Sequence, residues 1–268
     1  MTDASLDTST PHPARRYNYW LGGKDNFAAD RDSGDRVAKV FPSIVEAARE
    51  NRRFLQRAVR FLAGECGIDQ FLDIGAGLPS VDNTHEVAQR INPAARIVYV
   101  DNDPMVLAHG RALLFSAPQG RTAMVPADLR QPAAILANPA LRETLDLGRP
   151  VGLLLVAVLH FLDDADEPHR IVGELLGALP AGSWLVVSHV SQDLLTAEIA
   201  ALSDQVISES EVPTFLRTGE QISGFFSGLD LAEPGLVPVH RWRPDAPADA
   251  LAADTDIGVY GGVAVKPA

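Results

Sequence analysis

Cysteine is nearly absent from this sequence. Cys66 is the single cysteine among 268 residues. A lone cysteine excludes an intramolecular disulfide framework and a metal site built from several thiolates, and we expect no metal. Since proteins of a reducing compartment rarely rely on disulfides, we expect a cytoplasmic protein.

Basic residues are also in short supply. The 23 lysines and arginines are outnumbered by 35 aspartates and glutamates, which gives a formal net charge of −12. Because sequence-independent affinity for nucleic acids comes from lysine and arginine, we expect no nucleic-acid partner. A small molecule is the favoured partner.

Long hydrophobic runs are missing. The longest apolar run, VGLLLVAVLHFL at 151–162, is too short to span a bilayer. The first residues have no basic region followed by an apolar stretch, so they do not resemble a signal peptide. We expect neither secretion nor membrane insertion. Residues 1–13 are polar, small and interrupted by prolines, and we interpret them as a disordered tail.

Apolar residues at helical spacing follow this tail. They recur over 28–41 and again over 42–63, and Pro42 separates the two predicted helices. We expect residues 14–68 to form a helical cover on a second domain that comprises residues 69–268.

Short apolar runs then alternate with helical stretches, which predicts an α/β fold with a parallel sheet covered on both faces. We expect a helix over 218–227 with Thr218 as its N-cap. The segments 236–242 and 257–265 have no helical pattern between them, and we expect an antiparallel hairpin there. The five predicted parallel strands are FLDI at 71–74, RIVYV at 96–100, TAMV at 122–125, VGLLLV at 151–156 and WLVVSHV at 184–190.

The first of these strands runs into a glycine-rich loop, FLDIGAGLPS. Gly75 and Gly77 stand where the backbone must approach a ligand closely. A dinucleotide-binding loop would carry a third glycine where this chain has Ser80, and its strand would end on an apolar residue rather than on Asp73. A carboxylate at that place would repel a pyrophosphate, but it would suit an ammonium or sulfonium group.

Acidic residues follow three successive strands. Asp73, Asp101 and Asp128 fall at the carboxyl ends of predicted parallel strands, the rim where open α/β sheets bind ligands. Asp101 is placed to accept hydrogen bonds from the hydroxyl groups of a ribose. Asp128 is placed to accept a hydrogen bond from the amine of an adenine. The alternative is that the acids only cap helices, with Asp101 or Asp103 before one helix and Asp128 before the next.

These motifs resemble those of class I S-adenosylmethionine-dependent methyltransferases. DIGAG, VDNDP, ADLR and LHFLDD are similar to the successive motifs of that class. With YNYWLGGKDNFAADR, NTHEVAQ, VVSH and YGGVAVKP, residues 11–268 resemble a bacterial methyltransferase family first catalogued as a domain of unknown function. The resemblance implies a Rossmann-like, seven-stranded sheet whose last strand is inserted antiparallel. It also implies S-adenosylmethionine as cofactor and S-adenosylhomocysteine as product.

The resemblance also implies cofactor contacts position by position. The glycine loop would surround the methionine part, and the following strand ends would meet the ribose and the adenine. Residues after the fourth strand would form a floor under the sulfonium. The implied contacts are Asp73, Gly75, Ala76 and Gly77 for the methionine, Asp101 for the ribose, Asn102, Asp128 and Leu129 for the adenine, and Val156, Ala157 and Val158 for the floor.

The aromatic and basic segment RRYNYWLGGKDNF at 15–27 precedes all of this. We interpret it as a lid over the cofactor pocket, because aromatic rings can cover a cation or an adenine and a basic side chain can meet the methionine carboxylate. The alternative is that the aromatic residues only pack an N-terminal helix onto the sheet. The residues concerned are Tyr17, Tyr19 and Trp20, with Arg16 or Lys24 as the partner of the carboxylate.

Methyl transfer needs positioning above all, and a base only when the acceptor must lose a proton. His160 and His189, which follow the fourth strand and end the fifth, are the base candidates. The alternative for each is a buried histidine that forms a hydrogen bond with the backbone and has no catalytic role. No N-P-P-[YF] motif follows the fourth strand, so the expected acceptor is an unidentified small molecule such as a secondary metabolite.

Two other functions remain open at this point. A non-catalytic sensor or partner protein could bind S-adenosylmethionine without turning it over, because function lies in the site and not in the fold. An NAD(P)-dependent oxidoreductase on a related sheet is disfavoured by Asp73 and Ser80.

Overall fold

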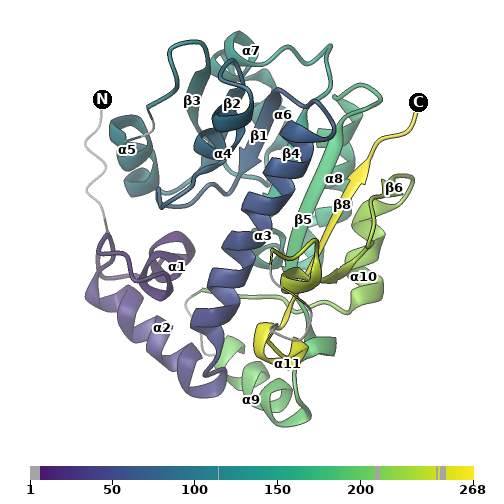
Figure 1. Ribbon diagram of the computed structural model, residues 1–268. Helices are drawn as coiled ribbons and strands as arrows, with labels where there is room; N and C mark the ends of the chain where they lie inside the picture. Colours follow the sequence, from purple (N-terminus) through teal and green to yellow (C-terminus); the bar gives the residue numbers. More distant parts are fainter. Residues whose placement is uncertain (1–6, 114, 209–211, 246, 248–251) are drawn as a thin grey trace.

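The computed structural model describes residues 7–113, 115–208, 212–245, 247 and 252–268. Its strands form one mixed sheet in the order β3-β2-β1-β4-β5-β8-β6, and β7 also pairs with β8 (Figure 1). The strands are β1 (Gln70–Ile74), β2 (Arg96–Asp101), β3 (Arg121–Pro126), β4 (Gly152–Val156), β5 (Trp184–Val190), β6 (Asp230–Leu231), β7 (Val237–Pro238) and β8 (Val259–Val265).

Strands β1 to β5 run parallel, so their carboxyl ends lie at one edge of the sheet. β1 pairs with β2 on one side and with β4 on the other, so the strand order reverses beside β1. The strand ends next to such a reversal are where open α/β sheets bind ligands. β8 is antiparallel and lies between β5 and the two-residue strands β6 and β7. The predicted Rossmann-like fold with an inserted antiparallel strand is therefore confirmed, with the outermost strand divided in two.

Alternate residues of β1 face opposite sides of the sheet, as the two-residue period of a strand requires. Phe71 packs in a cluster with Phe54 of α3, whereas Leu72 packs in a second cluster with Ile171 of α8. Both faces are thus covered by helices, which explains the continuous apolar runs. The helices are α1 (Pro13–Trp20), α2 (Ala28–Val40), α3 (Ile44–Gly64), α4 (Thr84–Ile91), α5 (Pro104–Leu113), α6 (Pro132–Ala137), α7 (Pro139–Thr144), α8 (Pro168–Gly177), α9 (Ala197–Ser208), α10 (Gly219–Ser223) and α11 (Asp254–Ile257).

Several helices gather at one end of the sheet. α1, α2, α9 and α11 lie together below the strands in Figure 1, and α2 contacts both α1 and α9. The long helix α3 runs from this group across one face of the sheet. The edge that contains the carboxyl ends of the parallel strands is therefore covered in part by the N-terminal helices.

The sequence predicted most elements up to the fifth strand within a residue or two. The five parallel strands and the helices over 28–41 and 42–63 are confirmed. The helix predicted over 218–227 begins as expected, since the Thr218 side chain accepts a hydrogen bond from Gln221 N–H. It ends earlier, at Ser223, and continues as a 3-10 turn.

The predicted closing hairpin is only partly right. Val237 and Pro238 pair with β8, but the chain leaves the sheet after Pro238. Val239 and Trp242 are instead buried against α3. The Arg57 guanidinium donates to both of their carbonyl oxygens, at 2.7 Å and 2.9 Å respectively. Burial against the helix and these two hydrogen bonds outweigh continued strand pairing.

Part of the predicted N-terminal tail, from residue 7 on, lies within the described residues. Residues 1–6 of the predicted tail lie outside the described residues. His12 Nδ1 lies 2.9 Å from Asp103 Oδ2, and His12 N–H donates to Asp30 Oδ1 at 2.9 Å. The chain is therefore held against the rim of the sheet before α1 begins.

Candidate functional site

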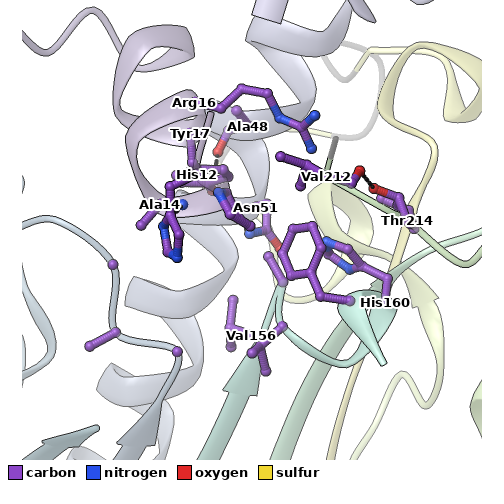
Figure 2. Close-up of a pocket in the computed structure, with 18 of the residues that line it drawn as sticks. His12, Ala14, Arg16, Tyr17, Ala48, Asn51, Val156, His160, Val212 and Thr214 are labelled. Atoms are coloured by element: carbon purple, nitrogen blue, oxygen red, sulfur yellow. Dashed lines mark hydrogen bonds between the residues drawn. The ribbon is translucent and has the colours of Figure 1, made fainter. Parts of the chain in front are cut away.

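A cavity of about 500 Å³ lies between the carboxyl ends of the parallel strands and the helices α1 and α2 (Figure 2). Volumes of about 300–1,000 Å³ are usual for small-molecule sites. The predicted site residues that line the cavity are Arg16, Asp73, Gly75, Ala76, Gly77, Asp101, Asn102, Asp128, Leu129, Val156, Ala157, Val158 and His160.

The glycine loop after β1 forms one wall. Gly75 and Gly77 have φ angles of +77° and +67°, which a residue with a side chain adopts at a cost. A Cβ atom on Gly75 would lie 2.6 Å from Val158 Cγ2, so this position also lacks space. A Cβ atom on Gly77 would meet nothing within 4 Å. The backbone at Gly77 therefore faces an open cradle that a ligand can fill.

Asp73, at the end of β1, is a buried carboxyl beside a cation. Its Oδ2 accepts a hydrogen bond from Thr84 Oγ1 at 2.6 Å. Burial raises its pKa to about 6, although the Thr84 hydrogen bond and the charge of Arg52 oppose the shift. Arg52 also lines the cavity; it donates to Asn83 Oδ1 at 3.1 Å, and its Nε has no partner among the described residues. This end of the cavity thus offers one carboxyl group and one guanidinium cation.

Asp101, at the end of β2, fixes the glycine loop. Its Oδ2 accepts a hydrogen bond from Gly77 N–H at 2.9 Å, and its Oδ1 accepts one from Asp103 N–H at 3.0 Å. Burial raises the pKa of Asp101 despite these two hydrogen bonds. Asp103 accepts from Met105 N–H at 2.6 Å, so Asp103 caps α5. Helix capping therefore does not account for Asp101.

Asn102 and Asp128 lie side by side at the next strand ends. Asn102 Nδ2 donates to Asp128 Oδ2 at 3.3 Å, and Asp128 Oδ1 accepts from Arg130 N–H at 2.9 Å. Leu129, which follows Asp128 in the sequence, is buried. Since α6 is capped at Gln131, Asp128 does not cap that helix. Its carboxylate instead stabilises the turn at Arg130 and lines the cavity.

Ala157 occupies the centre of the predicted floor in an unusual conformation, with φ of +55°. Its N–H donates to Ser188 Oγ at 2.9 Å, and Ser188 Oγ donates in turn to Asn51 Oδ1 at 2.5 Å. Asn51 Nδ2 continues the network to the hydroxyl of Tyr17 at 3.0 Å. These hydrogen bonds connect the floor after β4 with β5, α3 and α1, and so hold the turn in place.

His160 follows the floor in a short 3-10 turn and lines the cavity. It is 6% exposed, and its Nδ1 has no hydrogen-bond partner among the described residues. Burial holds its pKa well below the ordinary value, and the charges of His189 and Arg16 act in the same direction. The ring is therefore neutral at neutral pH, and its lowered pKa makes it a weak base.

His189 is a structural histidine and does not line the cavity. Its Nδ1 lies 2.6 Å from the carbonyl oxygen of Val190 and its Nε2 lies 3.0 Å from Arg217 Nη1. Burial lowers its pKa to about 4. Because both ring nitrogens are engaged, the structure does not support His189 as a base, and His160 remains.

Helical geometry divides the predicted lid segment into two faces. Arg16, Tyr17 and Trp20 line the cavity because residues four apart share one side of α1. Tyr19 points the other way and donates its hydroxyl to a carboxylate of α2 at 2.8 Å. Lys24 lies beyond the helix and is exposed. The structure therefore does not bring Tyr19 or Lys24 to the cavity.

Sequence reasoning missed several cavity residues. Arg52 and Asn51 stand in an ordinary amphipathic helix, where an RENRRF run reads as a solvated face. Ser80 was considered only as a missing glycine, yet its buried Oγ lines the cavity without a hydrogen-bond partner among the described residues. No local signal distinguished Asn51 and Arg52, because the packing of α3 on the sheet brings them to the site.

Comparison with known proteins gives a consistent result. A family model described as S-adenosyl methyltransferase matches residues 1–267. A DUF574 family protein from Streptomyces avermitilis MA-4680 has 46% sequence identity over 98% of this chain and 100% of its own, with a TM-score of 0.94. A candidate methyltransferase from Thermobifida fusca YX has 44% identity over 99% of this chain and 98% of its own, with a TM-score of 0.90.

More distant structures share the fold alone. The plantazolicin methyltransferase BamL, solved with S-adenosylhomocysteine, has 11% identity over 95% of this chain and 96% of its own, with a TM-score of 0.52. No curated protein matches. Within the described ranges, no helix combines the length and the apolar character that crossing a membrane would require.

Proposed function

Because the chain belongs to the S-adenosyl methyltransferase family, we propose that it methylates a small molecule held beside S-adenosylmethionine in the cavity. S-adenosylmethionine is the methyl donor. The observation that carries the proposal is one continuous cavity whose acidic end meets the glycine loop and whose other end is roofed by α1 and α2. The donor would take the acidic end and the acceptor the roofed end.

The residues of the acidic end fit the methionine part of the donor. Asp73 would hold the ammonium group, and Arg52, with its unpartnered Nε, would hold the carboxylate. The buried Ser80 hydroxyl is a further hydrogen-bonding group on this wall. The open cradle at Gly77 leaves room for the ligand against the backbone.

The neighbouring strand ends fit the nucleoside part. The Asp101 carboxylate would accept hydrogen bonds from the ribose hydroxyls, which is the usual role of an acid at the end of the second strand. Asp128 would accept a hydrogen bond from the adenine amine. Asn102 would lie beside the adenine ring, and Leu129 would supply apolar surface. Val156, Ala157 and Val158 would form the floor below the reacting centre.

When bound, S-adenosylmethionine supplies a methyl group already activated by a sulfonium, so the chain has to position the acceptor and exclude water. The network from Tyr17 through Asn51 and Ser188 to Ala157 fixes the floor relative to the roof. Helices α1 and α2 cover one side of the cavity and would limit the access of bulk water to it. An acceptor in this space would attack the methyl carbon in line.

His160 would take the proton that a hydroxyl or ammonium acceptor loses. We expect His160→Gln to lower kcat by about 10²–10⁴-fold, the usual contribution of general-base catalysis, with S-adenosylhomocysteine affinity unchanged. His109→Gln is the matched control, because His109 does not line the cavity.

The test of the function is release of S-adenosylhomocysteine, measured with S-adenosylmethionine and a panel of small hydroxylated and amino compounds. Mass spectrometry would identify the compound that gains a methyl group. Binding of the donor without product from any acceptor class would favour a sensor over an enzyme.

A further inference from the structure

Arg16 is a buried cation that forms no salt bridge in the described part of the chain, although the charge of Asp30 acts on it. It is 5% exposed, its Nε has no partner among the described residues, and its guanidinium makes one long hydrogen bond there, 3.4 Å from Nη1 to Ser33 Oγ. The guanidinium lies over the ring of Trp20, at 5.1 Å from the centroid. Burial and the charge of Arg36 lower its pKa to about 10, so it is still charged at neutral pH. A buried charge of this kind is costly unless a partner binds it.

The charge of Arg16 lies at the roofed end of the cavity. Figure 2 shows its side chain extending from α1 toward Val212 and His160. The charge acts on His160, whose pKa it helps to lower after the larger effect of burial. The cation that acts on Asp73 is Arg52. We therefore assign Arg52 to the end of the cavity that contains Asp73 and Arg16 to the end that contains His160, and the predicted pairing of Arg16 with the methionine carboxylate becomes the alternative to be tested.

Apolar side chains surround the rest of this end. They come from α2, from the segment before α9 and from the chain after 212, where the polar Ser191 and Thr214 also line the cavity. A ligand that fits would combine an anionic group with an apolar body. The apolar lining residues are Val37, Val40, Phe41, Leu195, Val212 and Leu216.

We infer that the methyl acceptor is a small carboxylic acid whose carboxylate pairs with Arg16 and whose apolar body lies under α2. This inference rests on the proposed function, since it assigns the acceptor end of the same cavity. The planar guanidinium can bind a carboxylate through two parallel hydrogen bonds, which a neutral amide of the same shape cannot match. The acidic residues at the other end of the cavity would repel such a carboxylate electrostatically and so keep it out of the donor site.

The test compares matched probes on the protein loaded with S-adenosylhomocysteine. Benzoate, 4-hydroxybenzoate and 3-phenylpropionate are titrated against their amides, and binding is followed by ligand-observed NMR. We expect each carboxylate that binds to do so at least about tenfold more tightly than its amide, as expected for a charge-assisted hydrogen bond.

Variants of Arg16 assign this preference to one residue. Arg16→Gln should abolish the difference between acid and amide, and Arg16→Lys should retain part of it. Arg36→Gln is the control, because Arg36 is an exposed neighbouring arginine of α2 that does not line the cavity. Affinity for S-adenosylhomocysteine should stay within about threefold in all three variants, which also shows that they fold.

Two results would overturn the inference. One is a panel in which no carboxylate binds more tightly than its amide. The other is a tenfold or larger loss of S-adenosylhomocysteine affinity in Arg16→Gln, which would assign Arg16 to the donor. Failure of the wild-type protein to bind S-adenosylhomocysteine at all would instead contradict the proposed function, so the two failures are distinct.

Discussion

Arg52 and Asp73 bring opposite charges to the same end of the cavity. If Arg52 holds the donor's carboxylate, Arg52→Gln should weaken S-adenosylhomocysteine binding by about tenfold or more, because a charged hydrogen bond to a carboxylate is lost. Isothermal titration calorimetry measures the change.

The next residue of α3 supplies the control for this experiment. Arg53 has the same charge but is exposed and pairs with Glu46 and Glu50 on the surface of α3. Arg53→Gln should leave the affinity unchanged. Equal losses in the two variants would mean that net charge, and not a contact of Arg52, governs binding.

If Asp73 holds the donor's ammonium group, donor binding should depend on pH. Its pKa of about 6, above the ordinary value of 3.8, means that the free protein holds a proton there below about pH 6. The donor's ammonium group prefers the ionised carboxylate, so affinity should fall by up to about tenfold for each pH unit below 6 and level off above it. The same shift makes the folded state bind the proton more tightly, so its contribution to stability declines as pH rises from about 4 to 6.

Calorimetry across this pH range, with Asp73→Asn alongside, checks the prediction. The Asn variant should bind S-adenosylhomocysteine weakly and with a flat profile. Asp69→Asn is the control, since Asp69 pairs with Arg149 at the opposite end of β1. A wild-type affinity that is independent of pH between 5 and 7 would contradict this role of Asp73.

At the scale of elements, the loop between β1 and α4 needs its glycines for different reasons. Gly75→Ala adds a Cβ atom 2.6 Å from Val158 in a left-handed backbone, and we expect a loss of roughly 1–3 kcal/mol in unfolding free energy. Gly77→Ala carries the backbone strain without the clash, so it should destabilise less but still weaken S-adenosylhomocysteine binding by filling the cradle.

Urea denaturation and calorimetry separate these two effects. Gly173→Ala in α8 is the control: its Cβ atom would enter open space within a helix, and the change should stabilise by about 0.5–1 kcal/mol. Loss of stability in Gly77→Ala as large as in Gly75→Ala would refute the distinction.

The sequence predicted elements well where one physical signal dominated. Continuous apolar runs located β1 to β5, because strands buried on both faces have no polar side. The prediction failed at Trp242, which looks like a strand residue but is buried against α3 and held there by Arg57. Arg57 and Trp242 are 185 residues apart in the sequence, so no local pattern could indicate this contact.

Site residues divide in the same way. The acids and glycines at strand ends could be predicted because parallel strands bring their carboxyl ends together. The predicted lid does not bring Tyr19 or Lys24 to the cavity, because α1 turns Tyr19 away and Lys24 lies beyond the helix. Arg52 was missed because its role depends on how α3 crosses the sheet.

At the scale of the whole molecule, the sheet supplies one wall of the cavity and the N-terminal helices supply the roof (Figure 1). His12 and Arg15 both approach Asp103 just after β2, with closest distances of 2.9 Å and 3.3 Å. The roof is thereby attached to the rim beside Asp101. These contacts thus hold the N-terminal helices against the sheet at the cavity.

The most direct test of this account is calorimetric titration of the protein with S-adenosylhomocysteine and with NAD, repeated on Asp101→Ala. Asp245→Ala is the control, because Asp245 is an exposed partner of Arg60 on the surface. The account predicts micromolar binding of S-adenosylhomocysteine that is lost in Asp101→Ala, retained in the control, and not shared by NAD. Binding of NAD alone, or S-adenosylhomocysteine affinity unchanged in Asp101→Ala, would contradict the assignment of the cavity.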